Sequence, residues 1–134
     1  MRLTSRYRFS ASHRLDTPAL SPQENQKLYG KCNNPHGHGH DYVLEITVDG
    51  PVDADGQVVN REALDAVVRE RVLARLDHKN LNADIPELAG SVTTTENLAT
   101  LVRKSLLDGW TLPAGLSGVR ISETARNTFE LEVA

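Results

Sequence analysis

The N-terminal fifteen residues alternate between apolar and polar side chains. Most odd positions carry an apolar or aromatic residue or a histidine, at Leu3, Tyr7, Phe9, Ala11, His13 and Leu15. The even positions carry arginine, serine or threonine throughout. Because successive side chains of a strand point to opposite faces of a sheet, this pattern predicts a strand with one face in the core and one face in solvent.

A second strand is predicted from about His38 to Asp49. Its alternate positions carry the apolar set Tyr42, Leu44, Ile46 and Val48. Between the two strands, residues 16–37 contain three prolines and two glycines, and this composition predicts a long loop. Loops of that length inside compact domains are usually functional or disordered.

Two helices are predicted in the middle of the chain from apolar residues at helical spacing. The first begins near Asn60, a residue type that favours helix N-caps, and its apolar stripe is Leu64, Val67, Val68, Val72 and Leu76. The second follows the threonines of VTTTEN, and its stripe is Leu98, Leu101, Val102 and Leu106. Two strands then end the chain around a hairpin at TARN, with the apolar positions Val119, Ile121, Phe129, Leu131 and Val133.

The resulting order is β-β-α-α-β-β, which predicts an α+β fold with an antiparallel sheet and the helices packed on one face. The chain shows no repeat, low-complexity segment or linker, so residues 1–134 are expected to form a single domain. A hydrophobic fraction of 39% is slightly lean for this length. We therefore expect a homo-oligomer, which buries further surface.

Composition also excludes several classes of protein. A net charge of −3 disfavours a general nucleic-acid binder, because such domains tend to be basic. No apolar run approaches the roughly 20 residues that span a bilayer, and the N-terminus lacks the apolar block of a signal peptide. A single cysteine forms no internal disulfide, which favours the reducing cytoplasm.

Three histidines are predicted to point into the core from two strands. His38 and His40 share the parity of the apolar set in the second strand, and His13 shares the parity of the apolar set in the first. A single inward histidine is usually a hydrogen-bonded core residue, but three together are costly to bury without a common partner. Three imidazoles with a fourth position open describe a catalytic zinc site.

Glu123 shares the parity of Val119 and Ile121, so its carboxylate is predicted to face the core and to need hydrogen-bond donors. The amide and amino edge of a pterin or guanine ring would supply two donors. A salt bridge to an arginine, or a strand end that reaches solvent, would also satisfy it.

Cys32 and the pair Asp77–His78 are candidates for proton transfer. A lone cysteine is usually a small buried hydrophobe, but one beside zinc and basic groups has a lowered pKa and can act as a base. A carboxylate and an imidazole in contact form a proton relay. Beyond a helix end, such a pair is more often a favourable charge arrangement.

Taken in order, the phrases FSASHRL, KCNNPHGHGHDY, LDHKNLN, TTEN and the ET of ISETARN resemble the 6-pyruvoyltetrahydropterin synthase family over nearly the whole chain. The resemblance implies a tunnelling fold (T-fold) with a four-stranded antiparallel sheet and two helices. It also implies assembly as a hexamer, built as a dimer of trimers. The zinc ligands of the family fall on His13, His38 and His40.

The resemblance also implies further roles. It places the catalytic cysteine on Cys32, its Asp-His partners on Asp77 and His78, and the pterin-anchoring glutamate on Glu123. The residues of the motif that lines the pterin pocket are Thr94, Thr95 and Glu96. No family role falls on His36, and Arg14, Lys27, Lys31 and Lys79 are the cations near enough in sequence to meet a triphosphate.

The implied substrate is 7,8-dihydroneopterin triphosphate, converted to 6-pyruvoyltetrahydropterin with loss of triphosphate. The related 6-carboxytetrahydropterin synthases, which serve queuosine synthesis, typically have three residues between the cysteine and the His-Gly-His, whereas five intervene here. A non-catalytic zinc or pterin-binding module would not need Cys32, Asp77 and His78 together. A dihydroneopterin aldolase of the same fold would not need the histidines.

Overall fold

The computed structural model describes residues 1–133, and within them five strands form one sheet in the order β3-β1-β2-β4-β5. The strands are β1 (Arg2–His13), β2 (His38–Asp49), β3 (Lys79–Asn80), β4 (Gly115–Ser122) and β5 (Thr128–Glu132). Neighbouring strands are antiparallel except β1 and β3, which run parallel. The prediction of a four-stranded antiparallel sheet was therefore wrong in one respect, because the chain that leaves the first long helix adds a short parallel edge strand.

The two long strands form as their patterns predicted. β1 and β2 pair along their full length, from Arg2 opposite Asp49 to His13 opposite His38. The alternate residues of β2 from Tyr42 to Val48 are fully buried, and the Tyr42 ring stacks on Phe9 with centroids 4.9 Å apart. The core therefore lies on the face of the sheet that the apolar parity selected.

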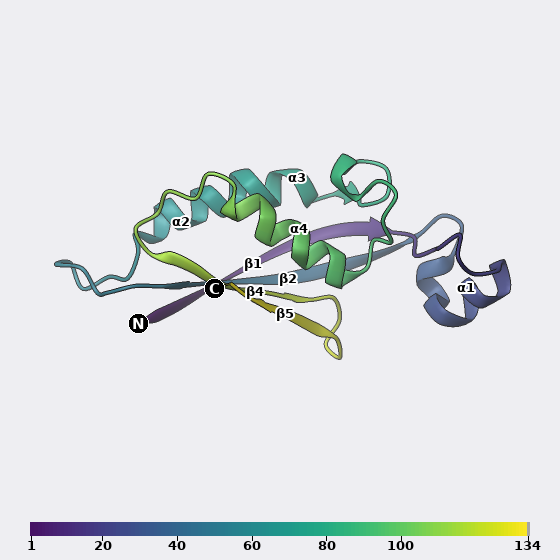
Figure 1. The fold of residues 1–134 in the computed structure, drawn as a ribbon, viewed down its shortest axis with the longest axis horizontal. Coiled ribbons are helices and arrows are strands. Elements are labelled where there is room, and N and C mark those ends of the chain that lie inside the picture. Colours follow the sequence, from purple (N-terminus) through teal and green to yellow (C-terminus); the bar gives the residue numbers. More distant parts are fainter. Residues whose placement is uncertain (134) are drawn as a thin grey trace.

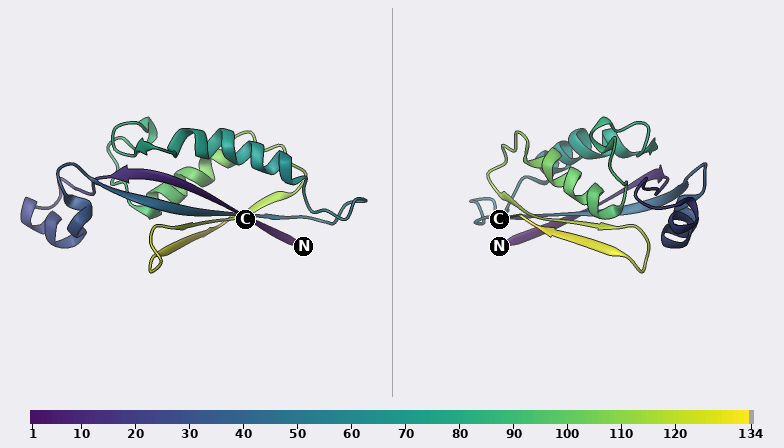
Figure 2. Two further views of the ribbon diagram at one scale, coloured as in Figure 1. Left: turned by 180° about the vertical axis from the view of Figure 1, so that it is seen from behind. Right: turned by 45° about the vertical axis from the view of Figure 1, so that its right-hand side comes forward.

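The core face is covered by two helical rods, as Figures 1 and 2 show, while no helix formed by residues 1–133 covers the opposite face of the sheet. The first rod is α2 (Arg61–Val68), a π-helical turn (Arg69–Leu73) and α3 (Ala74–Leu76). The second is α4 (Thr95–Leu107). Both begin where predicted, since Asn60 accepts a hydrogen bond from the Ala63 amide and Thr94 accepts one from the Asn97 amide.

The π turn has a cause in the sequence. The buried positions of this rod are Leu64, Val68, Val72 and Leu76, a spacing of four residues. An α-helix turns by about 100° per residue, so a four-residue spacing drifts by about 40° at each step. A turn that accommodates one extra residue cancels most of this drift. Leu76 therefore still faces the sheet at the end of the rod.

The segment 16–37 was predicted to be a loop, and this was wrong in part. It contains α1 (Pro22–Tyr29) and a 3₁₀ turn (Gly30–Asn33), which extend beyond the end of the sheet (Figure 1). Ser21 and Glu24 form a reciprocal capping box, and Pro22 occupies the first turn. This start signal is visible in the sequence. The helix itself was not predicted because α1 has no apolar stripe. Its buried residue is the polar Asn25.

The hairpin between β4 and β5 lies where TARN predicted it, with the Glu123 amide bonded to the Asn127 carbonyl. A second short 3₁₀ turn (Pro86–Leu88) precedes α4. Among the described residues, none of the helices combines the length and apolar character needed to cross a bilayer.

Candidate metal centre and active site

The three histidines predicted to bind zinc lie together at one end of the β1–β2 pair. His13 ends β1 opposite His38, and His40 lies opposite Ala11. The ring centroid of His40 is 5.0 Å from that of His13 and 4.6 Å from that of His38, both edge to face. The antiparallel register therefore brings the imidazoles of two strands together, as their parity predicted.

Two further side chains join this group. The potential ligand atoms of His13, Cys32, His40 and Glu123 all lie within 4.8 Å of one another. Glu123 Oε1 is 2.9 Å from His40 Nε2 and 3.6 Å from His13 Nε2, and Cys32 Sγ is 3.7 Å from His40 Nε2. Two imidazoles, a thiol and a carboxylate form a donor set typical of a metal site.

The hydrogen bonding of His13 tests whether a metal fits. Its side chain is fully buried, and Nδ1 lies 2.8 Å from the Thr93 carbonyl oxygen. A carbonyl oxygen only accepts, so Nδ1 carries the proton and Nε2 has a free lone pair. That Nε2 is buried without a hydrogen-bond partner among the described residues. A cation bound by Nε2 would satisfy it, and the residues present therefore fit a metal.

The protonation of His40 also favours a ligand role. Burial lowers the pKa of His40, the neighbouring His13 and His38 act in the same direction, and Glu123 opposes them. The imidazole is therefore neutral at neutral pH and keeps a lone pair for a metal.

Cys32 lies half-buried in the 3₁₀ turn beside this group. Burial raises the pKa of the Cys32 thiol, and the negative charge of Glu123 adds to the effect. Without added positive charge the side chain is a thiol, not the thiolate that acts as a base.

The structure differs from the sequence prediction in the membership of the group. His38 packs against His40 but lies outside the four side chains whose ligand atoms converge. Glu123, predicted as a substrate anchor, contacts His13 and His40 instead of an arginine or bulk solvent, and its side chain is 14% exposed. His36 is exposed on the loop before β2.

Thr93, Thr94 and Thr95 lie at the start of α4, and the first of them contacts His13. Thr93 accepts the hydrogen bond from His13, Thr94 caps α4, and Thr95 is buried with a hydroxyl that has no partner among the described residues. Glu96 is exposed in the first helical turn.

The Asp77–His78 pair lies between α3 and β3, beside Ser10 of β1. Asp77 Oδ1 accepts a hydrogen bond from the Ser10 amide, and Asp77 Oδ2 is 3.6 Å from His78 Nε2. The His78 side chain is 83% exposed, and its backbone adopts φ +60°. Among the described residues, no hydrogen bond or ion pair joins this pair to Cys32. A hollow of about 510 Å³ beside His78 is lined by Ser10, Asp41 and Asp84, among others.

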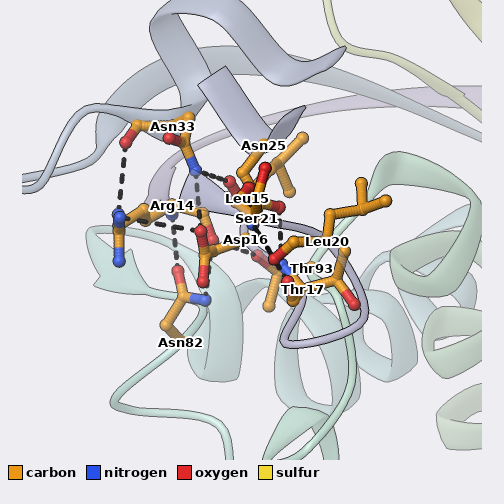
Figure 3. Close-up of polar contacts among 10 residues, drawn as sticks. All are labelled: Arg14, Leu15, Asp16, Thr17, Leu20, Ser21, Asn25, Asn33, Asn82 and Thr93. Carbon is orange, nitrogen blue, oxygen red and sulfur yellow. Dashed lines mark hydrogen bonds and ion pairs between the residues drawn. The ribbon is translucent and has the colours of Figure 1, made fainter. Parts of the chain in front are cut away.

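Two sets of supporting residues were not foreseen from the sequence. The Thr93 carbonyl that orients His13 has no sequence signal, because every residue carries one. The loop residues in Figure 3 form a hydrogen-bonded network in which Asn25, Asn33 and Asn82 bond mainly to main-chain groups. Asn25 and Asn33 lie in the segment 16–37, and Asn82 follows β3. The available signal was the residue type, since asparagine side chains commonly bond nearby backbone.

Comparison with known proteins places this geometry in a family. A family model described as 6-pyruvoyl tetrahydropterin synthase matches residues 2–133. The chain is 46% identical over 127 residues to the 6-pyruvoyl tetrahydrobiopterin synthase of Homo sapiens, covering 93% of this chain and 86% of that protein. It is 48% identical over 126 residues to the protein of the same name from Dictyostelium discoideum, covering 93% and 90%.

Solved structures agree. The 6-pyruvoyl tetrahydropterin synthase of Caenorhabditis elegans superposes with a TM-score of 0.91 at 36% identity, covering 100% of this chain and 96% of that chain. The enzyme of the same name from Plasmodium falciparum has a TM-score of 0.67 at 16% identity, covering 98% and 96%, which supports the T-fold alone.

Proposed function

This chain belongs to the 6-pyruvoyl tetrahydropterin synthase family and is a lyase, and from that premise we propose that it is a zinc-dependent enzyme. The proposed reaction converts 7,8-dihydroneopterin triphosphate to 6-pyruvoyltetrahydropterin with release of triphosphate. The observation that carries the proposal is the buried Nε2 of His13, which has no partner within residues 1–133 and lies in a group of converging ligand atoms. A divalent cation is the partner that this nitrogen lacks.

We assign zinc binding to His13, His38 and His40. His13 and His40 already point into the group, and the position of His38 opposite His13 and against His40 supports its role as the third ligand. A zinc ion held there would supply Lewis-acid chemistry to hydroxyl oxygens of the substrate.

We assign recognition of the pterin ring to Glu123, with Thr94, Thr95 and Glu96 lining the pocket. Both histidine contacts of Glu123 use Oε1, which leaves Oε2 for the amide and amino edge of a pterin. The buried hydroxyl of Thr95, unpartnered within residues 1–133, supports this assignment because a ligand would supply its missing hydrogen bond.

We assign proton transfer to Cys32, with Asp77 and His78 as its partners. The thiol lies 3.7 Å from His40 Nε2, so a substrate side chain at the metal site would be within its reach. Positive charge added to the group would favour the thiolate and oppose the effect of burial on the Cys32 pKa.

We further propose that the chain assembles as a homohexamer, a dimer of trimers. In the part of the chain that the structure describes, the sheet face opposite the helices carries no helix (Figure 2), and β5 is an edge strand. Both features support assembly. The exposure of His78 supports assembly as well, because His78 of one copy can then reach the Cys32 thiol of a neighbouring copy. Light scattering of the purified protein is expected to give six chains per particle.

Turnover of 7,8-dihydroneopterin triphosphate tests the proposed activity. We expect metal-loaded protein to release triphosphate and to form 6-pyruvoyltetrahydropterin, identified by mass. Cys32→Ala is expected to keep its metal and its pterin affinity while losing turnover. Acetaldehyde with a carboxylated pterin would assign the chain to the carboxy-forming reaction instead, and full activity of Cys32→Ala would remove this thiol from the mechanism.

A further inference from the structure

The turn that carries Cys32 is attached to the sheet at few points. It follows α1 beyond the end of β1 and β2 (Figure 1). The Cys32 carbonyl accepts a hydrogen bond of 2.6 Å from the Leu15 amide. Leu15 is buried and lies two residues after His13. This one main-chain bond therefore links the thiol segment to the strand end that supplies a metal ligand.

Asn33 adds the second attachment at the same place. Its side-chain amide donates to the Leu15 carbonyl at 2.6 Å and to Asp16 Oδ1 at 3.0 Å. Its own carbonyl accepts from Arg14 Nε at 3.2 Å. Figure 3 shows these bonds converging on the segment Arg14–Asp16. The Leu15 amide is thus bonded to Cys32, and the Leu15 carbonyl is bonded to Asn33.

The other side of this segment is fixed independently. The side chain of Asn82 bonds both main-chain groups of Arg14, accepting from the amide at 2.6 Å and donating to the carbonyl at 3.0 Å. Residues 14–16 are therefore a fixed support, and Asn33 fastens the cysteine turn to it.

We propose that Asn33 is a positioning residue that holds the Cys32 thiol against the metal group. The inference rests on the proposed function, in which the thiol moves protons. Removing the side-chain amide deletes the bonds to the Leu15 carbonyl and to Asp16. The turn then keeps the Leu15–Cys32 main-chain bond and the bond from the long Arg14 side chain to the residue-33 carbonyl, which leave it freer to shift. A misplacement of about 1 Å in a reacting group costs about 100-fold in rate.

Asn34 provides a matched control. It is the same residue type, adjacent in the chain and exposed, and its main chain bonds Lys31 and Gly37. Its side chain makes no hydrogen bond among the described residues. Asn34→Ala therefore removes an asparagine from this loop while keeping the clamp, by which we mean the Asn33 side-chain bonds to Leu15 and Asp16.

The experiment compares Asn33→Ala, Asn33→Asp and Asn34→Ala with the wild-type protein. Asn33→Asp keeps the shape but removes both donors and faces the carboxylate of Asp16. We expect both Asn33 variants to lower kcat by about 10- to 100-fold and to change KM by no more than about twofold. Their zinc content and melting temperature are expected to equal those of Asn34→Ala. Because Cys32 is the sole cysteine, its alkylation by iodoacetamide reports directly on the turn, and we expect a severalfold faster reaction in the Asn33 variants.

Equal kcat and equal alkylation rates in Asn33→Ala and Asn34→Ala would overturn the proposal. A parallel loss of zinc and of melting temperature would also overturn it, because Asn33 would then support folding in general. If the wild-type protein fails to turn over the substrate, the proposed function fails, while the alkylation rates still decide whether Asn33 holds the thiol in place.

Discussion

The chemistry of single residues at this site depends on where protons lie. The bond from His13 Nδ1 to the Thr93 carbonyl fixes the tautomer and directs a lone pair into the group. His40 is kept neutral by burial. Among the described residues, His13 Nε2 is buried without a hydrogen-bond partner. An unpaired buried polar atom is unfavourable, and a bound cation would relieve this cost.

The first prediction at this scale separates ligand histidines from a spectator. His40→Ala removes a nitrogen at the centre of the group, and zinc content per chain is expected to fall from about one to near zero. His36→Ala, at an exposed position two residues from His38, is expected to retain zinc. Elemental analysis after gel filtration measures both, and zinc retained by His40→Ala would contradict the assignment.

A second prediction concerns Tyr7, whose hydroxyl donates to Asp65 Oδ1 at 2.7 Å. Burial, with Asp65 adding to it, raises the pKa of Tyr7 to about 12. Between pH 10 and 12 the unfolded chain therefore loses this proton first, so stability is complete below pH 10 and falls as pH rises towards 12.

Tyr7→Phe is expected to cost about 1 kcal/mol at neutral pH through the lost hydrogen bond. It is also expected to show a shallower loss of stability between pH 10 and 12. Urea denaturation across that range measures both effects. Tyr29→Phe serves as the control, because the Tyr29 hydroxyl has no hydrogen bond among the described residues. An unchanged alkaline slope in Tyr7→Phe would argue against this linkage.

Among the elements, the rod α2–α3 is the one whose geometry departs from the regular form. The π turn keeps Leu76 in the core and delivers Asp77 to the Ser10 amide at 2.9 Å. The β1–β2 pair has the complementary role, since its register places the histidines of distant segments side by side. The rod therefore ends at Asp77, to which proton transfer is assigned. The strand pair ends at the histidines, to which metal binding is assigned.

Deleting Glu70, an exposed residue within the π turn, tests this role. The deletion is expected to restore regular helix and to rotate the following residues by about 100°. Leu76 would leave the core, and the melting temperature is expected to fall by several degrees or more. Glu70→Ala is the control and is expected to change stability by at most about 0.5 kcal/mol. Equal melting temperatures for the deletion and the control would show that the π turn has no such function.

At the scale of the whole molecule, the sheet separates two environments. One face is covered by the helices, while the other remains open (Figures 1 and 2). The group of His13, Cys32, His40 and Glu123 lies at the end of the β1–β2 pair. A ligand that binds only the folded chain stabilises it by mass action, by about 2.7 kcal/mol at one hundred times its dissociation constant. Zinc binding is therefore expected to be visible in the stability of the whole fold.

Removal of zinc with a chelator is expected to lower the melting temperature by roughly 10 °C, and added zinc is expected to restore it. His40→Ala is expected to show neither change. Calorimetry on the same preparation with and without the chelator measures the shift. Superimposable curves for the wild-type protein would mean that no stabilising cation binds this group.

The sequence by itself determined the long elements and the inward direction of the site residues. Strand parity follows from steric geometry within a few residues, so the bounds of β2 and the inward positions of His13, His40 and Glu123 were predictable. The caps at Asn60 and Thr94 were predictable for the same reason, because a cap bonds amides only two or three residues away.

Only the tertiary structure decided what those residues meet. The contacts of Glu123 with two imidazoles, the carbonyl of Thr93 beneath His13 and the edge strand β3 join segments that lie far apart in the chain. The clamp of Asn33 on Leu15 spans eighteen positions. Such contacts depend on how whole elements pack, and local residue patterns carry no signal for them.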